Sequence, residues 1–358
     1  MPQTILTINP GSTSTKIAVF EDEKELFSQN VAHTCDEIGA FPTIASQQEF
    51  RERHIRSALA ERAFDLKRLT AVVGRGGLLR PIPGGVYRVT AAMKRDIETA
   101  RYGEHASNLG ALIADRLATE LGIPAFIADP VVVDELSDIA RVSGHKLFQR
   151  RSIFHALNQK AVARRWCREK GKAYEEAVLI VAHMGGGVSV GLHQGGRVVD
   201  VNNALNGEGP FSPERSGTLP AGDLVKLCFS GKYQEKDILR MITGQGGLVS
   251  FMGSNDMRTA EKGMHAGEPV ATLYYQAFIY QVGKAIGALG AAAKGAVDAI
   301  ILTGGIAYGP EVVQGIDEMC NFIAPVLAYP GEGELEALAQ AGLRALSDPS
   351  AVLDYEEA

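Results

Sequence analysis

The sequence lacks several features that would place it quickly in a class of proteins. Its four cysteines are scattered without a Cys-x-x-Cys pair, so free thiols in a reducing compartment are expected rather than disulfides. No run of about 18 apolar residues is present, which argues against a membrane-spanning helix. The net charge of −6 argues against general nucleic-acid binding. The first residues already read as a strand, so we expect no signal peptide and a cytoplasmic protein.

What is present indicates an ordinary globular protein of more than one domain. At 358 residues the chain exceeds a typical single core, and 46% hydrophobic with 22% charged residues is a usual balance. The 40 glycines occur in clusters, which predicts turns that are closely approached by other groups. The spacing of Ile55, Leu59 and Phe64 predicts a helix over 50–68. Strands and helices alternate from there on, so parallel β-α units are expected.

The first hairpin is a candidate phosphate-binding element. An apolar strand over 4–8 enters a turn over 9–16, and a second strand follows over 17–20. Backbone N–H groups, hydroxyls and a lysine at such a turn are suited to an anion. The turn is not a Walker A loop, because Gly-Lys-Ser/Thr before a helix is absent. An ordinary surface hairpin is the alternative. The tip carries Ser12, Thr13, Ser14, Thr15 and Lys16.

The second half of the chain repeats this pattern. A strand over 177–183, a glycine turn over 184–187 and strands over 188–192 and 197–201 match the meander of residues 4–33. Repetition on this scale predicts two similar domains, each offering one hairpin tip to a shared cleft.

Further candidates lie where predicted strands end. Arg75 precedes Gly76-Gly77, Asp129 precedes Pro130, and Gly304-Gly305 ends a late strand. Open α/β sheets bind ligands at the carboxyl ends of their strands. A turn-forming Asp-Pro and a surface ion pair of the arginine are the plainer alternatives for the first two.

Six segments in order carry a resemblance to a known family. They are Asn9–Lys16, His105–Leu109, Phe154–His155, His183–Gly187, Arg215–Gly217 and Ser254–Arg258. The combination resembles the acetate and sugar kinase, heat-shock chaperone and actin superfamily, and within it the acetate kinase branch of carboxylate kinases. The resemblance implies an α/β fold of two duplicated ribonuclease H-like domains around an interdomain nucleotide cleft. The implied domains are 1–148, with a returning segment over 331–358, and 149–330.

Two departures from the family pattern narrow the resemblance. Gln159 stands where a second histidine would follow His155, and Gly76-Gly77 replaces bulky valines after the catalytic arginine. A deeper acid pocket is expected if the glycines line it. Together with the shorter chain, these features resemble the butyrate kinase subgroup and its branched-chain relatives. The implied reaction is ATP plus butyrate, or a branched short-chain acid, giving ADP and the acyl phosphate, reversibly.

The resemblance assigns roles to residues of this chain, with ATP/ADP and Mg²⁺ as cofactors. The implied catalytic residues are Arg75, Arg215, His155 and Asn9. Those implied at the phosphate and acid are Ser12, Ser14, Lys16, Gly76, Gly77, His105 and Phe154. Those implied at the nucleotide are His183, Gly185, Gly186, Gly187, Asp256, Arg258, Gly304 and Gly305. The implied metal-associated acids are Asp129 and Glu332, with Glu334 as the alternative to the latter. His183 could equally be a hydrogen-bonded core residue.

Other activities of the same fold stay open at this stage. An acetate or propionate kinase is one alternative, and a sugar or polyol kinase with Asp129 as general base is another. A non-metabolic ATP-driven switch is a third. The family further suggests a homodimer or higher homo-oligomer, with neither nucleic acid nor membrane as a partner. The Ala/Gly-rich helix expected over 269–294 could pack at that interface or in the core.

Overall fold

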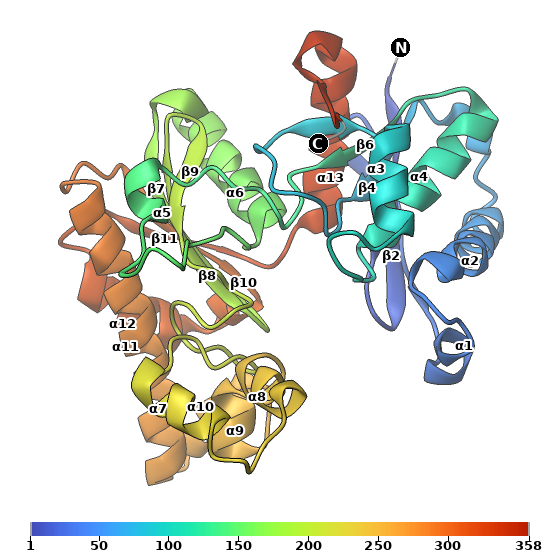
Figure 1. The fold of residues 1–358 in the computed structure, drawn as a ribbon. Coiled ribbons are helices and arrows are strands. Elements are labelled where there is room, and N and C mark those ends of the chain that lie inside the picture. Colours follow the sequence, from blue (N-terminus) through green and yellow to red (C-terminus); the bar gives the residue numbers. More distant parts are fainter. Residues whose placement is uncertain (1, 357–358) are drawn as a thin grey trace. The chain divides into compact units, whose positions relative to one another are not determined.

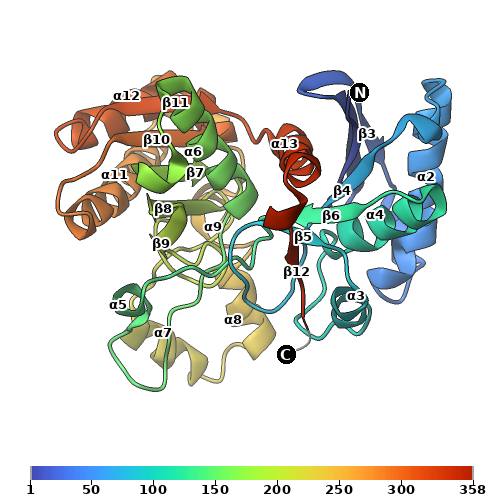
Figure 2. The same ribbon diagram turned by 90° about the horizontal axis from the view of Figure 1, so that it is seen from above.

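The computed structural model describes residues 2–356, and the chain forms two compact units. Unit 1 contains the residues up to Val133 and those from Gly333 onward, and unit 2 contains Asp134–Glu332. The domain limits expected from the sequence, at residues 148 and 330, stay a prediction. Each unit is built on one β-sheet with helices on its faces (Figures 1 and 2).

Unit 1 has a mixed seven-stranded sheet in the order β12-β5-β6-β4-β1-β2-β3. The strands are β1 (Thr4–Pro10), β2 (Ser14–Glu21), β3 (Lys24–Ala32), β4 (Ala71–Arg75), β5 (Val86–Arg88), β6 (Ala125–Ala128) and β12 (Leu353–Asp354). The helices are α1 (Cys35–Gly39), α2 (Gln48–Glu61), α3 (Ala91–Glu98), α4 (Asn108–Leu121) and α13 (Glu334–Ser347). β1 pairs antiparallel with β2 and parallel with β4, so it lies inside the sheet.

The inner strand β1 is buried on both faces, as its apolar composition predicts. Leu6 packs with Leu109 of α4 in the main hydrophobic cluster. On the other face, a β-carbon added to Gly342 of α13 would lie 2.9 Å from the side chain of Ile5. Alternate residues of a strand point to opposite faces. Helices α4 and α13 therefore cover opposite faces of the sheet, as Figure 2 also shows.

Unit 2 repeats this arrangement with five strands in the order β11-β10-β7-β8-β9. They are β7 (Val178–Met184), β8 (Val188–Gln194), β9 (Arg197–Val201), β10 (Ala299–Gly304) and β11 (Val326–Pro330). The helices are α5 (Asp138–Arg141), α6 (Ala156–Lys170), α7 (Ala221–Cys228), α8 (Glu235–Ile242), α9 (Gly247–Met252), α10 (Met257–His265), α11 (Pro269–Ala292) and α12 (Pro310–Cys320). The central strand β7 is antiparallel to β8 and parallel to β10, as β1 is to β2 and β4. The predicted duplication is therefore confirmed.

The two faces of the unit 2 sheet pack against different helices. Leu179 and Val181 lie in one cluster with Trp166 of α6. Ile180 lies in a second cluster with Phe278 of α11, on the opposite face. Among residues 2–356, no helix is both long and apolar enough to cross a membrane.

Candidate functional site

In unit 1, predicted site residues come together at one edge of the sheet. Asn9 lies near the end of β1, Arg75 is the last residue of β4, and Asp129 follows β6. The three strands are parallel to one another, since β4 pairs in parallel with both β1 and β6. The carboxyl ends of parallel strands share one edge, where open sheets bind ligands. The predicted positions of Arg75 and Asp129 at strand ends are confirmed, while their roles stay a prediction.

A carboxylate that the sequence left open joins this group. The two oxygens of Glu334, the first residue of α13, face the guanidinium of Arg75 at 2.9 and 3.2 Å. Oε2 also accepts a hydrogen bond of 2.5 Å from Nδ2 of Asn9, and Nη1 of Arg75 donates to Oδ1 of Asn9 at 3.2 Å. Arg75 thus binds both oxygens of the carboxylate, and Asn9 adds a hydrogen bond to one of them. Glu332, the alternative acid, lies in unit 2.

Asp129 has a strained backbone that its neighbours hold in place. Its φ of 37° is in the left-handed region, which residues other than glycine rarely adopt. Its N–H donates to the carbonyl of Gly85 at 2.9 Å, and its Oδ1 accepts the N–H of Gly85 at 2.8 Å. Strain of this kind gathers at functional sites. The strain is consistent with a functional role for Asp129, and both that role and the ordinary Asp-Pro turn stay open.

Gly76 and Gly77 do not open a pocket. A β-carbon added to Gly76 would lie 2.6 Å from Cβ of Pro130, and one added to Gly77 would lie 2.2 Å from Oδ1 of Asn108. The same oxygen accepts the N–H of Leu78 at 2.7 Å, which fastens this segment to the start of α4. The expectation that the glycines deepen the acid pocket is therefore wrong. They are needed because the chain passes too close to its neighbours for any side chain.

The first hairpin tip is held from beneath by Arg51 of α2, which the sequence analysis did not identify. Its guanidinium is fully buried and donates to the carbonyls of Gly11 at 2.7 Å, Ser12 at 3.0 Å and Ser14 at 3.2 Å. Gln47 accepts two more of its hydrogen bonds. These bonds turn the tip carbonyls inward, while the side chains of Ser12 and Lys16 are exposed. The periodicity of α2 marks Arg51 only as one more charged residue.

Replacing Arg51 by methionine is expected to lower the free energy of unfolding by about 3 kcal/mol or more, because several buried carbonyls lose their donor. Urea unfolding measures the change. Arg51→Lys should recover only a part, since an ammonium offers three donors from one nitrogen, whereas the guanidinium donates from three nitrogens to the tip and to Gln47. Arg53→Met is the matched control, because Arg53 is exposed on the same helix. Equal stability of the Arg51→Met and Arg53→Met proteins would contradict this role.

A buried histidine behind the same tip is expected to make unit 1 sensitive to acid. Nε2 of His33 lies 2.9 Å from the hydroxyl oxygen of Thr15, and Arg51 donates to the same oxygen. Burial, followed by the charge of Arg51, lowers the pKa of His33 to about 4. An unfolded histidine has a pKa near 6.5, so the unfolded state takes up the proton first as the pH falls.

We expect His33 to cost the fold up to about 3 kcal/mol as the pH falls from 6.5 to 4. Urea midpoints measured across that range should fall, and they should fall less in the His33→Gln protein. His265→Gln is the control, because His265 is exposed beside Glu311. An unchanged pH dependence in the His33→Gln protein would show that another group is responsible.

In unit 2, the turn between β7 and β8 corresponds to the first hairpin. The N–H of Gly185 donates to the carbonyl of Gly187 at 3.0 Å, and the hydroxyl of Ser212 donates to the carbonyl of Gly186 at 2.6 Å. A β-carbon added to Gly187 would lie 2.1 Å from Nη1 of Arg215. The same Nη1 donates to the carbonyl of Ala204 at 2.8 Å. Glycine at 187 thus lets the guanidinium lie directly on the turn.

Two histidines stand beside this turn. The rings of His155 and His183 stack with centroids 3.8 Å apart and an angle of 11°. Nδ1 of His183 lies 2.7 Å from Oδ1 of Asn158, whose Nδ2 donates to the carbonyl of Glu332. His183, whose role the sequence left open, is therefore tied to the segment that ends unit 2. Phe154 precedes His155 and is buried.

A cavity of about 600 Å³ opens beside the turn within unit 2. This size is typical of small-molecule sites. Asp256 caps α10, and its carboxylate forms two-point hydrogen bonds with the guanidinium of Arg258 at 2.7–3.0 Å. Gly304 precedes Gly305 of the lining, and its φ of 86° and close approach to the backbone of Met184 require glycine there. Of the predicted residues, the cavity lining includes Gly185, Gly186, Asp256, Arg258, Gly305 and Glu332.

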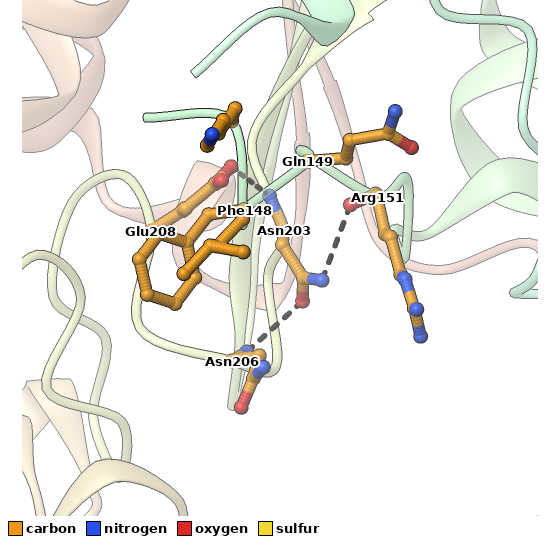
Figure 3. Close-up of a pocket in the computed structure, with 8 residues that line it drawn as sticks. Phe148, Gln149, Arg151, Asn203, Asn206 and Glu208 are labelled. Atoms are coloured by element: carbon orange, nitrogen blue, oxygen red, sulfur yellow. Dashed lines mark hydrogen bonds between the residues drawn. The ribbon is translucent and has the colours of Figure 1, made fainter. Parts of the chain in front are cut away.

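A second cavity, of about 430 Å³, is lined by residues of the segment 146–151 together with Asn203, Asn206 and Glu208 (Figure 3). It contains no predicted site residue. Asn203 organises it: Nδ2 donates to the carbonyl of Arg151 at 3.1 Å, and Oδ1 accepts the N–H of Asn206 at 2.9 Å. Glu208 accepts the backbone N–H of Asn203 at 2.9 Å. These hydrogen bonds therefore anchor the chain just before Phe154 and His155.

Comparisons of sequence and of structure with known proteins both find acetate and butyrate kinases. A sequence profile of the acetokinase family matches residues 136–323. The chain is 53% identical over 357 residues to a probable butyrate kinase of Clostridium botulinum, covering 100% of this chain and 99% of that one. It is 53% identical over 352 residues to butyrate kinase 2 of Clostridium acetobutylicum, covering 98% and 99%. The crystal structure of Porphyromonas gingivalis acetate kinase superimposes with a TM-score of 0.77 at 20% identity, covering 96% and 100%. This last likeness confirms the predicted fold class.

Proposed function

The chain belongs to the acetokinase family, and from this premise we propose that it is a butyrate kinase. The reaction transfers the terminal phosphoryl group of ATP to the carboxylate of butyrate or a branched short-chain acid, giving ADP and the acyl phosphate, and it is reversible. The observation that carries the proposal is the 53% identity, over the whole chain, to proteins named butyrate kinase.

For this reaction the protein must bring two anions together, the carboxylate of the acid and the phosphates of ATP. A carboxylic acid of this type is ionised at neutral pH, by analogy with Asp and Glu, so no general base is needed. Positioning and charge stabilisation then dominate phosphoryl transfer. Arg75 and Asn9 suit the acid, because in this structure they already bind a carboxylate, that of Glu334. The exposed Ser12 and Lys16, with Ser14 and the backbone of Gly76-Gly77, suit its phosphorylated form.

Unit 2 supplies the nucleotide side of the reaction. The turn over Gly185–Gly187 suits the ATP phosphates, and the cavity beside it suits the adenosine, with Asp256, Arg258 and Gly305 in its wall. Arg215 and His155 border one point above Gly187, where they can donate to the transferring group. Within unit 1, His105 is proposed to position the acid. Within unit 2, the buried Phe154 is proposed to support His155, and His183 and Gly304 to support the turn.

Magnesium fits this arrangement as a partner of the nucleotide rather than as a caged ion. Residues 2–356 contain no group of at least three His, Cys, Asp or Glu residues that could hold a metal. Mg²⁺ usually takes one or two carboxylates, several waters and substrate phosphates. When bound, it offsets the negative charge of the phosphates. In unit 2, Glu332 lines the nucleotide cavity and suits the ion beside the phosphates. In unit 1, Asp129 is the candidate carboxylate, because Glu334 is already paired with Arg75.

The test is whether ADP release depends on an acid. With butyrate present, ADP release should be rapid, and with glucose or glycerol it should equal the blank. A sugar or polyol kinase with Asp129 as base would show the reverse pattern. An ATP-driven switch would release ADP at the same rate with every additive. Acetate or propionate as the best substrate would keep the reaction type and overturn the subgroup.

We further propose a cytoplasmic enzyme that self-associates through α11. This helix exposes apolar side chains, with Val270 57%, Leu273 61% and Tyr280 56% exposed. Scattered apolar residues need no partner, but several on one helix favour an interface. Light scattering gives the mass in solution, and a monomer at all concentrations would contradict the proposed association.

A further inference from the structure

A chain of buried hydrogen bonds runs behind His155 in unit 2. The hydroxyl of Tyr174 lies 2.8 Å from Nδ1 of His193, and Nε2 of His193 lies 3.1 Å from Oε1 of Gln159. Nε2 of Gln159 lies 2.8 Å from Oγ of Ser189, which lies 2.9 Å from Nδ1 of His155. Gln159, Ser189 and His193 are completely buried. Each donor in such a place needs an acceptor, so the direction of the chain can be worked out.

The direction is set by Gln159. Its Nε2 also lies 3.0 Å from the backbone carbonyl of Ser189, which can only accept. The amide nitrogen must therefore face Ser189 and the amide oxygen must face His193. Both hydrogens of the amide nitrogen are used, one on the carbonyl and one on Oγ of Ser189.

The far end of the chain agrees with this direction. An amide oxygen accepts only, so Nε2 of His193 carries a hydrogen. Burial, with the nearby charges of Lys160 and Arg164, lowers the pKa of His193 well below its usual value, so the ring is neutral. Its Nδ1 then accepts the hydrogen of Tyr174. Each hydrogen between Tyr174, His193 and Gln159 therefore has one donor and one acceptor.

At the near end, the hydroxyl of Ser189 receives a hydrogen from Gln159 and has one hydrogen to give. The nitrogen placed to accept it is Nδ1 of His155. We propose that Ser189 and Gln159 are positioning residues that hold His155 as a neutral ring with its hydrogen on Nε2. A charged His155 would put a second hydrogen on Nδ1 and leave the hydroxyl of Ser189 without that acceptor.

The neighbouring ring is fixed in the opposite form. Nδ2 of Asn158 donates to the carbonyl of Glu332, so its Oδ1 faces His183 and Nδ1 of His183 carries the hydrogen. The rings stack 3.8 Å apart, an arrangement that two cations would oppose. His155 is thus set up to donate from Nε2 without changing its protonation during turnover. The catalytic meaning of this donor rests on the proposed function, but the position of the hydrogen does not.

Nitrogen-15 NMR of the full chain with labelled histidine tests the proposal. The resonances of His155 are assigned by their loss in the His155→Gln protein. At neutral pH we expect Nε2 protonated and Nδ1 bare, with strong coupling of a hydrogen to Nε2. Protonation of Nδ1 in the wild-type protein, alone or together with Nε2, would overturn the proposal. This spectrum needs no variant that might fail to fold.

Two variants separate positioning from simple packing. Ser189→Ala removes the donor to Nδ1, so a population with the hydrogen on Nδ1 should appear and kcat should fall about tenfold, while KM for ATP stays near its wild-type value. Ser152→Ala is the matched control, because Ser152 is also buried in unit 2 and its hydroxyl has no hydrogen-bond partner in the described structure. An unchanged His155 spectrum in the Ser189→Ala protein would overturn the proposal. If the wild-type ring is as expected but no acid is phosphorylated, the proposed function fails and the tautomer stands.

Discussion

Replacing Arg215 by alanine is expected to lower kcat on the order of a thousandfold, the loss found when an arginine that stabilises phosphoryl transfer is removed. Its guanidinium lies on the turn at Gly187, beside His155, and it remains charged although burial lowers its pKa. The positive charge of Arg215 thus lies where the phosphoryl group would be transferred. Steady-state rates of acyl phosphate formation, at saturating ATP and acid, measure the loss.

The controls distinguish lost chemistry from a damaged loop. Arg215→Lys should recover only a small part, because an ammonium cannot bridge the carbonyl of Ala204 and a phosphoryl oxygen in one plane. Arg165→Ala removes an exposed arginine of the same unit, paired with Glu169, and should leave the rate unchanged. A kcat of Arg215→Ala within tenfold of the wild-type value, in a folded protein, would remove Arg215 from the transfer step.

The second large effect is expected at Arg75. Arg75→Ala should lower kcat/KM for the acid by about a hundredfold or more, because a two-point charged hydrogen bond to a carboxylate is lost. The Kd for ATP should change little, because Arg75 belongs to unit 1 and the nucleotide cavity lies within unit 2. Parallel titrations of acid in the rate assay and of ATP by calorimetry measure the two quantities separately.

The chain offers a matched control for this variant. Arg68 is an exposed arginine of unit 1 that pairs with Glu21 at 2.9 Å, and Arg68→Ala should affect neither quantity. The double variant Arg75→Ala, Glu334→Gln tests whether the loss arises because the carboxylate of Glu334 is left unpaired. An Arg75→Ala protein with weak ATP binding and normal use of the acid would reverse the assignment of Arg75.

The sequence was sufficient for the features that depend on local pattern. The repeated strand–turn–strand segments around the first hairpin and around Gly185–Gly187 predicted the duplication, because strand periodicity and turn residues are local signals. The strand ends at Arg75 and Asp129 were likewise visible. Since parallel strands align their carboxyl ends, their meeting at one edge followed from topology alone.

Features that depend on packing between distant segments were not visible. Glu334 meets Asn9 and Arg75 only because α13 returns to the sheet of unit 1, and no spacing in the chain marks this contact. Gly76 and Gly77 suggested an open pocket, but the space before them is filled by Pro130 and Asn108. The lack of side chains at Gly76 and Gly77 does not reveal which neighbouring residues fill the space.

Helix limits and buried polar contacts were missed for similar reasons. The apolar spacing over 50–68 predicted one helix, but α2 ends at Glu61 and the backbone turns at Ala63, with a φ of 52°. Arg51 is one of several charged residues of that stretch, and no spacing marks it as the one that is completely buried against the hairpin tip. Periodicity shows which face of a helix is apolar, but not which charged residue satisfies buried carbonyls.

The measurement that tests the central claim most directly is the trapping of the product with hydroxylamine across straight and branched acids from C2 to C5. The purified chain, ATP and Mg²⁺ are supplied with each acid, and the hydroxamate is quantified over a range of acid concentrations. The account predicts hydroxamate from several acids, with the highest kcat/KM for butyrate or isobutyrate. Hydroxamate from none of the acids, with a protein that still binds ATP, would contradict it.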